Sequence, residues 1–196
     1  DVTVKWDGAP AVFAGIDPSD GKFFVAKKGI FNKDPKVYKS EADVRADTSG
    51  DLADKLTIAY NELKDLGIKD VIQGDIMFTK NDLNVENIDG EKYVTFQPNT
   101  IVYAVPVKSD LAKTIMKANL GVVFHTTYTG KFFEEMKASY GVKIDKLKKK
   151  TSIWYQDANY KDQSGTATLT ATETKEVTEA LSKAGKIFQK IAGTTL

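Results

Sequence analysis

Cysteine is absent from this 196-residue sequence, and histidine occurs once, at position 125. The absence of cysteine excludes disulfide bonds and thiolate metal sites, and it is typical of proteins from a reducing compartment. A single histidine excludes a zinc site built from several histidines and disfavours a Ser-His-Asp triad. Because no window approaches about eighteen uninterrupted apolar residues, we expect no membrane span and a cytoplasmic location.

Net charge is also nearly absent. The 28 basic and 27 acidic residues leave a net charge of +1, so any argument for binding nucleic acid must be a local one. The content of 41% hydrophobic and 28% charged residues is typical of a globular protein with a substantial core. Because the sequence starts with Asp1 rather than Met, we interpret residues 1–196 as one domain of a chain trimmed at both ends.

Alternating apolar and polar residues predict the strands, and spacings of three and four residues predict the helices. Strands are expected on both sides of Asp7-Gly8 and within 22–28, 70–78, 93–97, 100–107, 121–128 and 152–156. Helices are expected at 52–66, 110–118 (capped by Ser109), 131–140 and 173–192, with irregular polar segments at 32–43 and 157–172. This arrangement predicts an α+β fold with mainly antiparallel sheets and packed helices, in which residues 2–28 form a meander.

Lys5 raises the first functional question, because it stands two residues before Asp7-Gly8 between two apolar arms. A lysine amine becomes a nucleophile only after losing its proton, which requires a pKa well below the usual value of about 10.4. Apolar neighbours or nearby cations such as Lys27 and Lys28 would provide such an environment. The alternative is a lysine at a strand end with its amine in water.

Four motifs in the first half of the chain occur in a defined order. They are 5-KWDG-8, 26-AKKG-29, 74-GD-75 within a predicted strand, and Tyr103 within 100-TIVYAVPV-107. This series resembles the covalent nucleotidyltransferases, which comprise ATP-dependent DNA and RNA ligases and mRNA capping enzymes. The longer sequences around these motifs, KWDGAPA, FFVAKKGIF and QGDIMF, are similar to those of ligase-like proteins of tailed bacteriophages.

The resemblance implies a ligase-type, ATP-grasp-like core and a role for each matched residue. Lys5 would attack the α-phosphate of ATP and form a lysyl-AMP intermediate, with Asp7 and Gly8 beside the nucleotide. Lys28 would contact the ribose or phosphates, Asp75 would bind a ribose hydroxyl or Mg²⁺, and Tyr103 would stack on adenine. The nucleotide would lie between two sheets, and AMP would then pass to a 5′-phosphate of DNA or RNA. For a phage protein, the location would be the cytoplasm of the host.

The sequence departs from the ligase pattern at several points. Asp75 replaces the usual glutamate and is one carbon shorter, and Pro10 stands where DNA ligases commonly carry an arginine. A Glu-Gly strand motif is missing. Ligases also have a late Lys-x-Lys strand, whose lysines bind the α-phosphate, and only the stretch 146–150 matches it here. The alternatives for this stretch are a solvated basic face or a contact for a nucleic acid backbone. Its lysines are Lys146, Lys148, Lys149 and Lys150.

Two further functions stay open on the sequence alone. One is a non-catalytic nucleic-acid-binding or virion-associated phage protein on the same fold, since a fold does not dictate a function. The other is a purely structural domain. His125, within 121-GVVFHTTY-128, is either a hydrogen-bonded strand residue or an acid–base group. The sequence does not define an oligomeric state.

Overall fold

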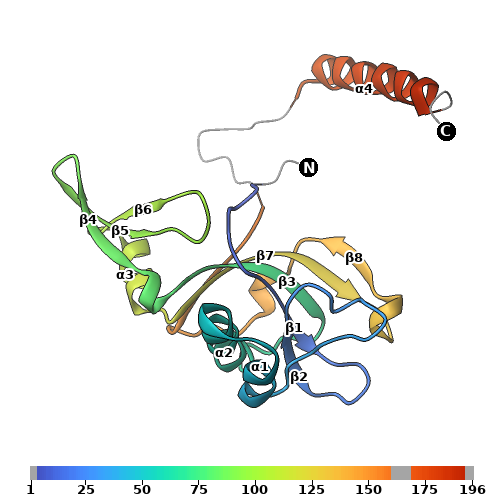
Figure 1. Cartoon of the computed structure of the whole chain (residues 1–196). Helices are drawn as coiled ribbons and strands as arrows, with labels where there is room; N and C mark the ends of the chain where they lie inside the picture. The colour runs from blue at the N-terminus through green and yellow to red at the C-terminus, as the bar shows by residue number, and fades with distance from the viewer. Residues whose placement is uncertain (1–3, 160–168, 193–196) are drawn as a thin grey trace. The chain divides into compact units, whose positions relative to one another are not determined.

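The computed structural model describes residues 4–159 and 169–192 (Figure 1). The chain divides into two compact units, residues 1–160 and residues 161–196. The second unit contains the helix α4 (Ala171–Ala192), which confirms the helix predicted at 173–192. Apolar side chains of α4, including Val177, Leu181 and Phe188, are exposed. Among the described residues, no helix has both the length and the apolarity needed to cross a bilayer.

A six-stranded sheet forms the centre of the first unit (Figure 1). Its order is β2-β1-β3-β7-β8, and β9 pairs with the other half of the β7 edge. The strands are β1 (Ala11–Ile16), β2 (Phe23–Ala26), β3 (Val71–Thr79), β7 (Leu120–Thr129), β8 (Lys137–Tyr140) and β9 (Ile153–Asp157). All pairs are antiparallel except β7 with β9. The predicted α+β class with mainly antiparallel sheets is therefore confirmed.

A smaller sheet of three strands lies at one end of the large one (Figure 1). It contains β4 (Asn84–Ile88), β5 (Glu91–Phe96) and β6 (Tyr103–Pro106), followed by α3 (Asp110–Lys117). As predicted, Ser109 caps α3, because its hydroxyl accepts a hydrogen bond from the Ala112 N–H. A core cluster that includes Phe78, Phe96, Ile115 and Trp154 joins this sheet and α3 to the large sheet.

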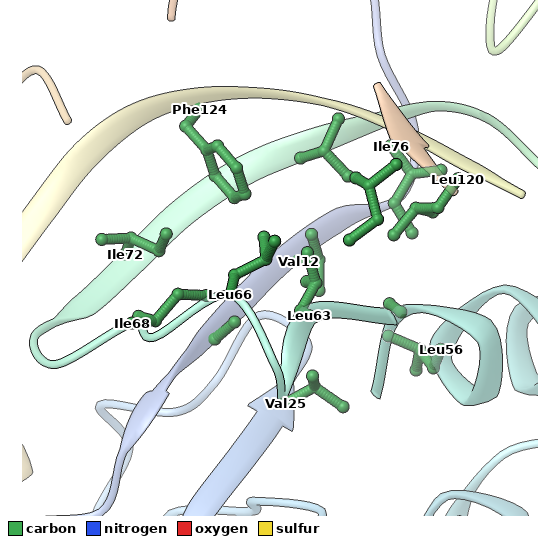
Figure 2. Packing of buried hydrophobic residues seen from close by; sticks show 14 of the residues in the cluster. Val12, Val25, Leu56, Leu63, Leu66, Ile68, Ile72, Ile76, Leu120 and Phe124 are labelled. Atoms are coloured by element: carbon green, nitrogen blue, oxygen red, sulfur yellow. The ribbon is translucent and has the colours of Figure 1, made fainter. Parts of the chain in front are cut away.

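The main core lies between the large sheet and α2 (Gly50–Leu63). Leu56 and Leu63 of α2 pack with Val12, Ile76 and Phe124 of the sheet, and all five are fully buried (Figure 2). Apolar burial of this extent is the main contribution to the stability of a domain of this size. The core fixes the positions of β1, β3 and β7, which carry the candidate site.

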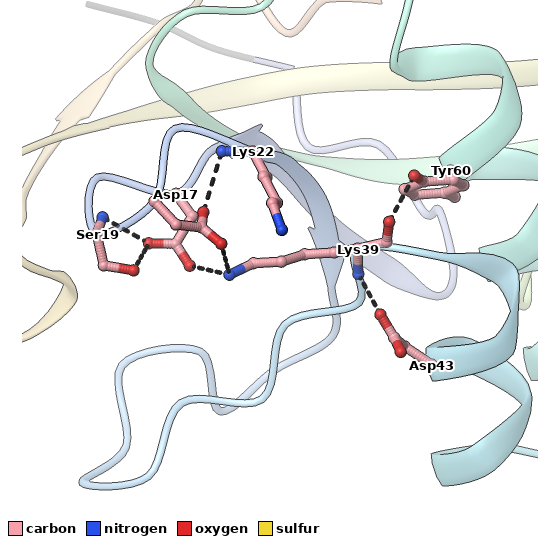
Figure 3. A network of polar contacts seen from close by, with 7 residues as sticks. Asp17, Ser19, Lys22, Lys39, Asp43 and Tyr60 are labelled. Carbon is pink, nitrogen blue, oxygen red and sulfur yellow. Dashed lines mark hydrogen bonds and ion pairs between the residues drawn. The ribbon is translucent and has the colours of Figure 1, made fainter.

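A polar network fastens the β1–β2 turn to the helices (Figure 3). The Lys39 ammonium lies 2.7 Å from the Asp17 carboxylate and 2.8 Å from that of Asp20. Burial acts to raise the pKa of Asp17, but hydrogen bonds from Lys39 and Ser19 outweigh it and hold that pKa below its usual value. The Tyr60 hydroxyl of α2 donates to the Lys39 carbonyl, so the turn predicted at 16–21 is tied to the core.

Three local predictions were wrong. Residues 131–140 form a 3₁₀ turn (η2, Phe133–Glu135) and the strand β8, because the backbone pairs with the free edge of β7. The segment 32–43, predicted to be irregular, includes the start of α1 (Glu41–Asp47), which Ser40 caps through the Asp43 N–H. Residues 4–8 form no strand, whereas residues 2–3 lie outside the described part of the chain. The remaining short helices are η1 (Lys80–Asp82) and η3 (Ile144–Lys146).

Replacing a buried leucine of α2 tests this core. We expect Leu63→Ala to lower the free energy of unfolding by about 2–5 kcal/mol, because it removes a fully buried side chain and leaves a cavity. Leu111→Ala on α3 is the matched control, since Leu111 is exposed and its loss should change stability by about 0.5 kcal/mol or less. Urea unfolding measures both, and equal losses would contradict the described core.

Candidate active site

The segment from Val4 to Pro10 is anchored along its length to the rest of the first unit. The Val4 N–H donates to the Ala158 carbonyl at 3.1 Å, next to the end of β9. The Ala9 N–H donates to the Ile76 carbonyl, and the Ile76 N–H donates to the Pro10 carbonyl, both at 3.0 Å. The segment then continues into β1, in which Ala11 pairs with Asp75 of β3. The Lys-x-Asp-Gly motif is therefore fixed against β3.

Gly8 makes the closest contact in this segment. A Cβ atom on Gly8 would lie 2.5 Å from the Asp75 Cβ and 2.9 Å from the Met77 sulfur. Because real Cβ atoms essentially never approach so closely, only a glycine at position 8 allows the motif to lie this close to β3. The Lys-x-Asp-Gly and Gly-Asp motifs, which are far apart in the sequence, thus meet directly.

A cavity of about 590 Å³ opens beside this contact. Its walls come from the Val4–Pro10 segment and β1, the end of β2, α2, β3 and β7. The lining residues are Gly8, Ala9, Pro10, Ala11, Lys27, Lys28, Leu52, Gln73, Asp75 and His125. The volume is in the range of small-molecule sites in proteins, and the lining combines apolar, cationic and anionic groups. Three of the sequence-predicted residues, Gly8, Lys28 and Asp75, meet in it.

Lys5 lies three residues before Gly8, with its side chain exposed. It is near enough to Asp75 for its positive charge to lower the pKa of that carboxyl. Its neighbour Trp6 is partly buried against the core cluster that joins the small sheet to the large one, with its ring stacked on Tyr103 at 5.6 Å and edge-on to Trp154 at 6.5 Å. Burial of the Trp6 indole thus fixes the backbone from which the Lys5 amine extends.

Asp75 is the carboxylate of the cavity. Its side chain is 24% exposed, and its Oδ2 lies 3.8 Å from the Nε2 of His125. Burial raises the pKa of Asp75, while the charges of His125, Lys5 and Lys28 act in the opposite direction. Its carboxylate therefore gains from any cation that approaches it.

The two lysines of the 26-AKKG-29 motif differ in their partners. Lys27 forms an ion pair with Asp47 at the end of α1, at 3.0 Å. Asp47 also accepts hydrogen bonds from Lys36 and from the Tyr38 hydroxyl, and these contacts hold its pKa well below the usual range. Lys28, in contrast, is exposed at the cavity, and its charge acts on Asp75.

Asp7 binds a loop of the protein itself. Its carboxylate accepts hydrogen bonds from the Thr100 hydroxyl and N–H and from the Ile101 N–H, at 2.7, 2.7 and 2.9 Å, and another from the Asn99 side chain. These bonds lower the pKa of Asp7 to about 2. In this arrangement Asp7 fastens the motif to the β5–β6 connection, and the structure gives it no contact with the cavity.

Tyr103 is also engaged within the protein. Its ring stacks on Trp6 and on Phe96, with centroid distances of 5.6 and 5.3 Å, and its hydroxyl accepts a hydrogen bond from the Asp7 N–H. A purine could stack on Tyr103 only by displacing one of these rings. Like Asp7, Tyr103 lies outside the lining of the cavity.

The lysine-rich stretch 146–150 packs near the end of α2 rather than at the cavity. Lys150 is 3.2 Å from the Glu62 carboxylate, and the Lys148 N–H donates to the Leu66 carbonyl. Lys146, Lys148 and Lys149 have exposed side chains. The stretch is a 3₁₀ turn and a loop that precede β9.

The sequence leaves the role of His125 open and gives no functional signal for Leu52, yet both residues line the cavity. Leu52 carries only the periodicity of a helix, so the sequence gives no separate signal for a role at the site. His125 stands out in the sequence as the single histidine, but its place 3.8 Å from the Asp75 carboxylate depends on the pairing of β3 with β7.

The fold and site thus define an α+β protein with a mixed-charge cavity at the Lys-x-Asp-Gly segment. Residues 1–195 match the model of a protein family described as a family of unknown function, DUF6267, and the chain belongs to this family. Searches of curated proteins and of solved structures found no match.

Substituting Gly8 tests the contact between the two motifs. We expect Gly8→Ala to lower the free energy of unfolding by about 1–3 kcal/mol, because the added methyl group collides with Asp75 and Met77. Gly185→Ala is the control, since nothing lies within 4 Å of the added atom in α4. Thermal unfolding of the first unit should change only in Gly8→Ala, and an unchanged transition there would contradict the close contact.

The charge of Asp7 gives a pH-dependent prediction. Because the folded pKa is about 2, below the usual 3.8, the stabilisation by Asp7 is present above 3.8 and is lost as the pH falls through about 2. The amide resonances of Thr100 and Ile101, which donate to Asp7, should titrate with that low midpoint in NMR spectra. Asp7→Asn should abolish the titration and speed hydrogen exchange at both amides, whereas a midpoint near 3.8 in the wild type would exclude these bonds.

Proposed function

We propose that this protein is an ATP-dependent nucleotidyltransferase of the polynucleotide ligase type, with Lys5 as the nucleophile. The observation that carries the proposal is the contact of Gly8 with Asp75 at the edge of a cavity that also contains Lys28. Gly8, Lys28 and Asp75 belong to three motifs that resemble those of covalent nucleotidyltransferases, and all three residues line this cavity, whose volume suits a small molecule. The resemblance of the motifs supplies the reaction.

In the first step, the unprotonated Lys5 amine attacks the α-phosphorus of ATP. A nitrogen–phosphorus bond forms, and the bond from the α-phosphorus to its bridging oxygen breaks, so that pyrophosphate leaves with the electron pair. The amine releases a proton to water. Lys28 reduces the charge repulsion that the triphosphate presents to the neutral Lys5 amine. Lys5 does not line the cavity, so the reaction requires its exposed side chain to turn toward the bound nucleotide.

The residues present fit a divalent cation, because Asp75 is a half-buried carboxylate. Burial raises the pKa of Asp75, and a bound cation would stabilise its charged form. Asp75 would hold Mg²⁺, together with oxygens of the triphosphate and water. When bound, the cation supplies charge compensation for the phosphates. Asp75 is one carbon shorter than the glutamate of the ligase pattern, which suits a cation beside the strand better than a distant ribose hydroxyl.

The place of the purine differs from the one that the motifs imply. Trp6 and Phe96 already stack on the ring of Tyr103. The apolar side chains of Pro10 and Leu52 in the cavity lining are therefore the better surface for the base. This wall also accounts for Pro10 at a position where DNA ligases carry arginine. Tyr103 then contributes indirectly, by holding the Asp7 backbone and Trp6.

In the second step, AMP passes to nucleic acid. An oxygen of a 5′-phosphate attacks the phosphorus of lysyl-AMP, the nitrogen–phosphorus bond breaks, and Lys5 takes up a proton. A 3′-hydroxyl of the adjoining strand then displaces AMP and seals the break. The exposed side chains of Lys146, Lys148 and Lys149 offer a basic surface for the DNA or RNA backbone.

Covalent labelling tests the proposal. Incubation with α-labelled ATP and Mg²⁺ should give a protein band that keeps its label on a denaturing gel and loses it in acid. Lys5→Ala and Lys5→Arg should reduce the label at least about 100-fold, since neither carries the amine. Lys22→Ala, at an exposed lysine outside the cavity lining, should be labelled like the wild type.

Two outcomes would contradict the enzyme assignment. A label that persists in Lys5→Ala would place the nucleophile elsewhere. No label at all, together with a salt-dependent shift of DNA or RNA on a native gel, would favour the non-catalytic nucleic-acid-binding alternative.

A further inference from the structure

A β-bulge in β7 places His125 in the lining of the cavity, with the Thr126 hydroxyl beside its ring. Gln73 pairs with Thr126 and Gly74 pairs with Phe124, so His125 is the extra residue between the two pairs. Bulges of this kind turn side chains out of strict alternation and are frequent beside active sites. Gly74 allows the bulge to approach, because a Cβ atom there would lie 2.5 Å from the Val123 carbonyl oxygen.

The bulge holds the His125 ring in one orientation. The ring Nδ1 lies 2.7 Å from the Thr126 hydroxyl oxygen, which leaves Nε2 facing Asp75. Histidines that bind metals are commonly oriented in this way, through a hydrogen bond at the other ring nitrogen. The two side chains are 27% and 24% exposed, so both lie partly buried in the cavity wall.

The separation of the two groups fits an atom between them. The distance of 3.8 Å from Nε2 to the Asp75 Oδ2 is too long for a hydrogen bond. A cation with bonds of about 2.1 Å to nitrogen and to oxygen spans up to about 4.2 Å, so it reaches both atoms from one side. The two atoms are therefore within reach of one metal ion, and binding would draw them closer, to the separation of about 3.0–3.4 Å between adjacent ligands of an octahedral or tetrahedral ion.

We propose that Asp75 and His125 together bind a divalent cation, and that the imidazole makes this site favour Mn²⁺ over Mg²⁺. Imidazole is a common ligand of first-row transition metals, whereas Mg²⁺ takes oxygen ligands almost throughout. The proposal rests on the proposed function, because the phosphates of the nucleotide complete the coordination. Thr126 is a positioning residue, since it acts on the metal through the His125 ring.

Binding of the metal should depend on the nucleotide for two reasons. Within residues 4–159 and 169–192, no group of three or more histidine, aspartate or glutamate side chains could hold a metal ion, so the pair needs further ligands. In addition, the charges of Lys5 and Lys28 act on Asp75 and oppose a cation in the free protein. The phosphates supply oxygen ligands and also neutralise these lysines.

Pulsed electron paramagnetic resonance of Mn²⁺ tests the proposal directly. The sample is the full chain with Mn²⁺ and α,β-methylene-ATP, which cannot be cleaved between the α- and β-phosphates. We expect nitrogen modulation from a directly bound imidazole in the wild type, and a much weaker retention of Mn²⁺ when the nucleotide is omitted. Mn²⁺ bound without nitrogen coupling would overturn the proposal, and the wild-type protein alone is sufficient for this test.

Variants give the second readout. His125→Gln should abolish the nitrogen signal and weaken Mn²⁺ binding at least about 10-fold. Its Mg²⁺ affinity should fall less. Thr126→Val should keep the imidazole but weaken Mn²⁺ binding by about 10-fold, and Thr126→Ser should restore it, as expected for a hydroxyl that orients a ligand. Equal Mn²⁺ affinity in the wild type and His125→Gln would contradict the proposal.

Labelling of Lys5 separates this inference from the proposed function. Lysyl-AMP formation without nitrogen coupling would remove His125 from the metal site and leave the nucleotidyltransferase intact. Absence of both the label and nucleotide-dependent Mn²⁺ binding would overturn the two together.

Discussion

The contact between Gly8 and Asp75 is the constraint on which the candidate site depends. Because Gly8 has no side chain, the Val4–Pro10 segment can lie directly on β3, where backbone hydrogen bonds to Ile76 hold it. The contact holds the Val4–Pro10 segment on β3, in the middle of the large sheet. The core that supports this sheet lies between its strands and α2. One residue without a Cβ atom thus sets the position of Lys5 relative to the carboxylate and the cavity.

Packing around this contact divides the motif residues into two groups. The charges of Lys5 and Lys28 act to lower the pKa of Asp75, and Lys28 and Asp75 line the cavity. Asp7, Trp6 and Tyr103 instead make a structural clasp, in which a carboxylate with a pKa of about 2 binds the Asn99–Ile101 loop and the rings stack. The clasp gives the aspartate of the Lys-x-Asp-Gly motif a structural role, because its hydrogen bonds fix the backbone between Lys5 and Gly8.

Much of the fold could be predicted from local patterns, since β1, β3, β7 and α2 combine clear periodicity with turn or capping residues. The failures occurred where pairing between distant strands decides the structure. Residues 131–140 are apolar at helical spacing, yet the open edge of β7 draws them into β8. In the site, Gly8, Lys28 and Asp75 could be predicted because short motifs carry them. The place of His125 could not, because a bulge is a property of two paired strands, and neither sequence alone contains it.

A crystal structure of the protein with α,β-methylene-ATP tests the central claim most directly. We expect the triphosphate in the cavity beside Asp75 and Lys28, with the α-phosphorus about 3–3.5 Å from the Lys5 amine. A nucleotide bound elsewhere, or a triphosphate whose α-phosphorus lies beyond the reach of Lys5 while its other end fills the cavity, would contradict it.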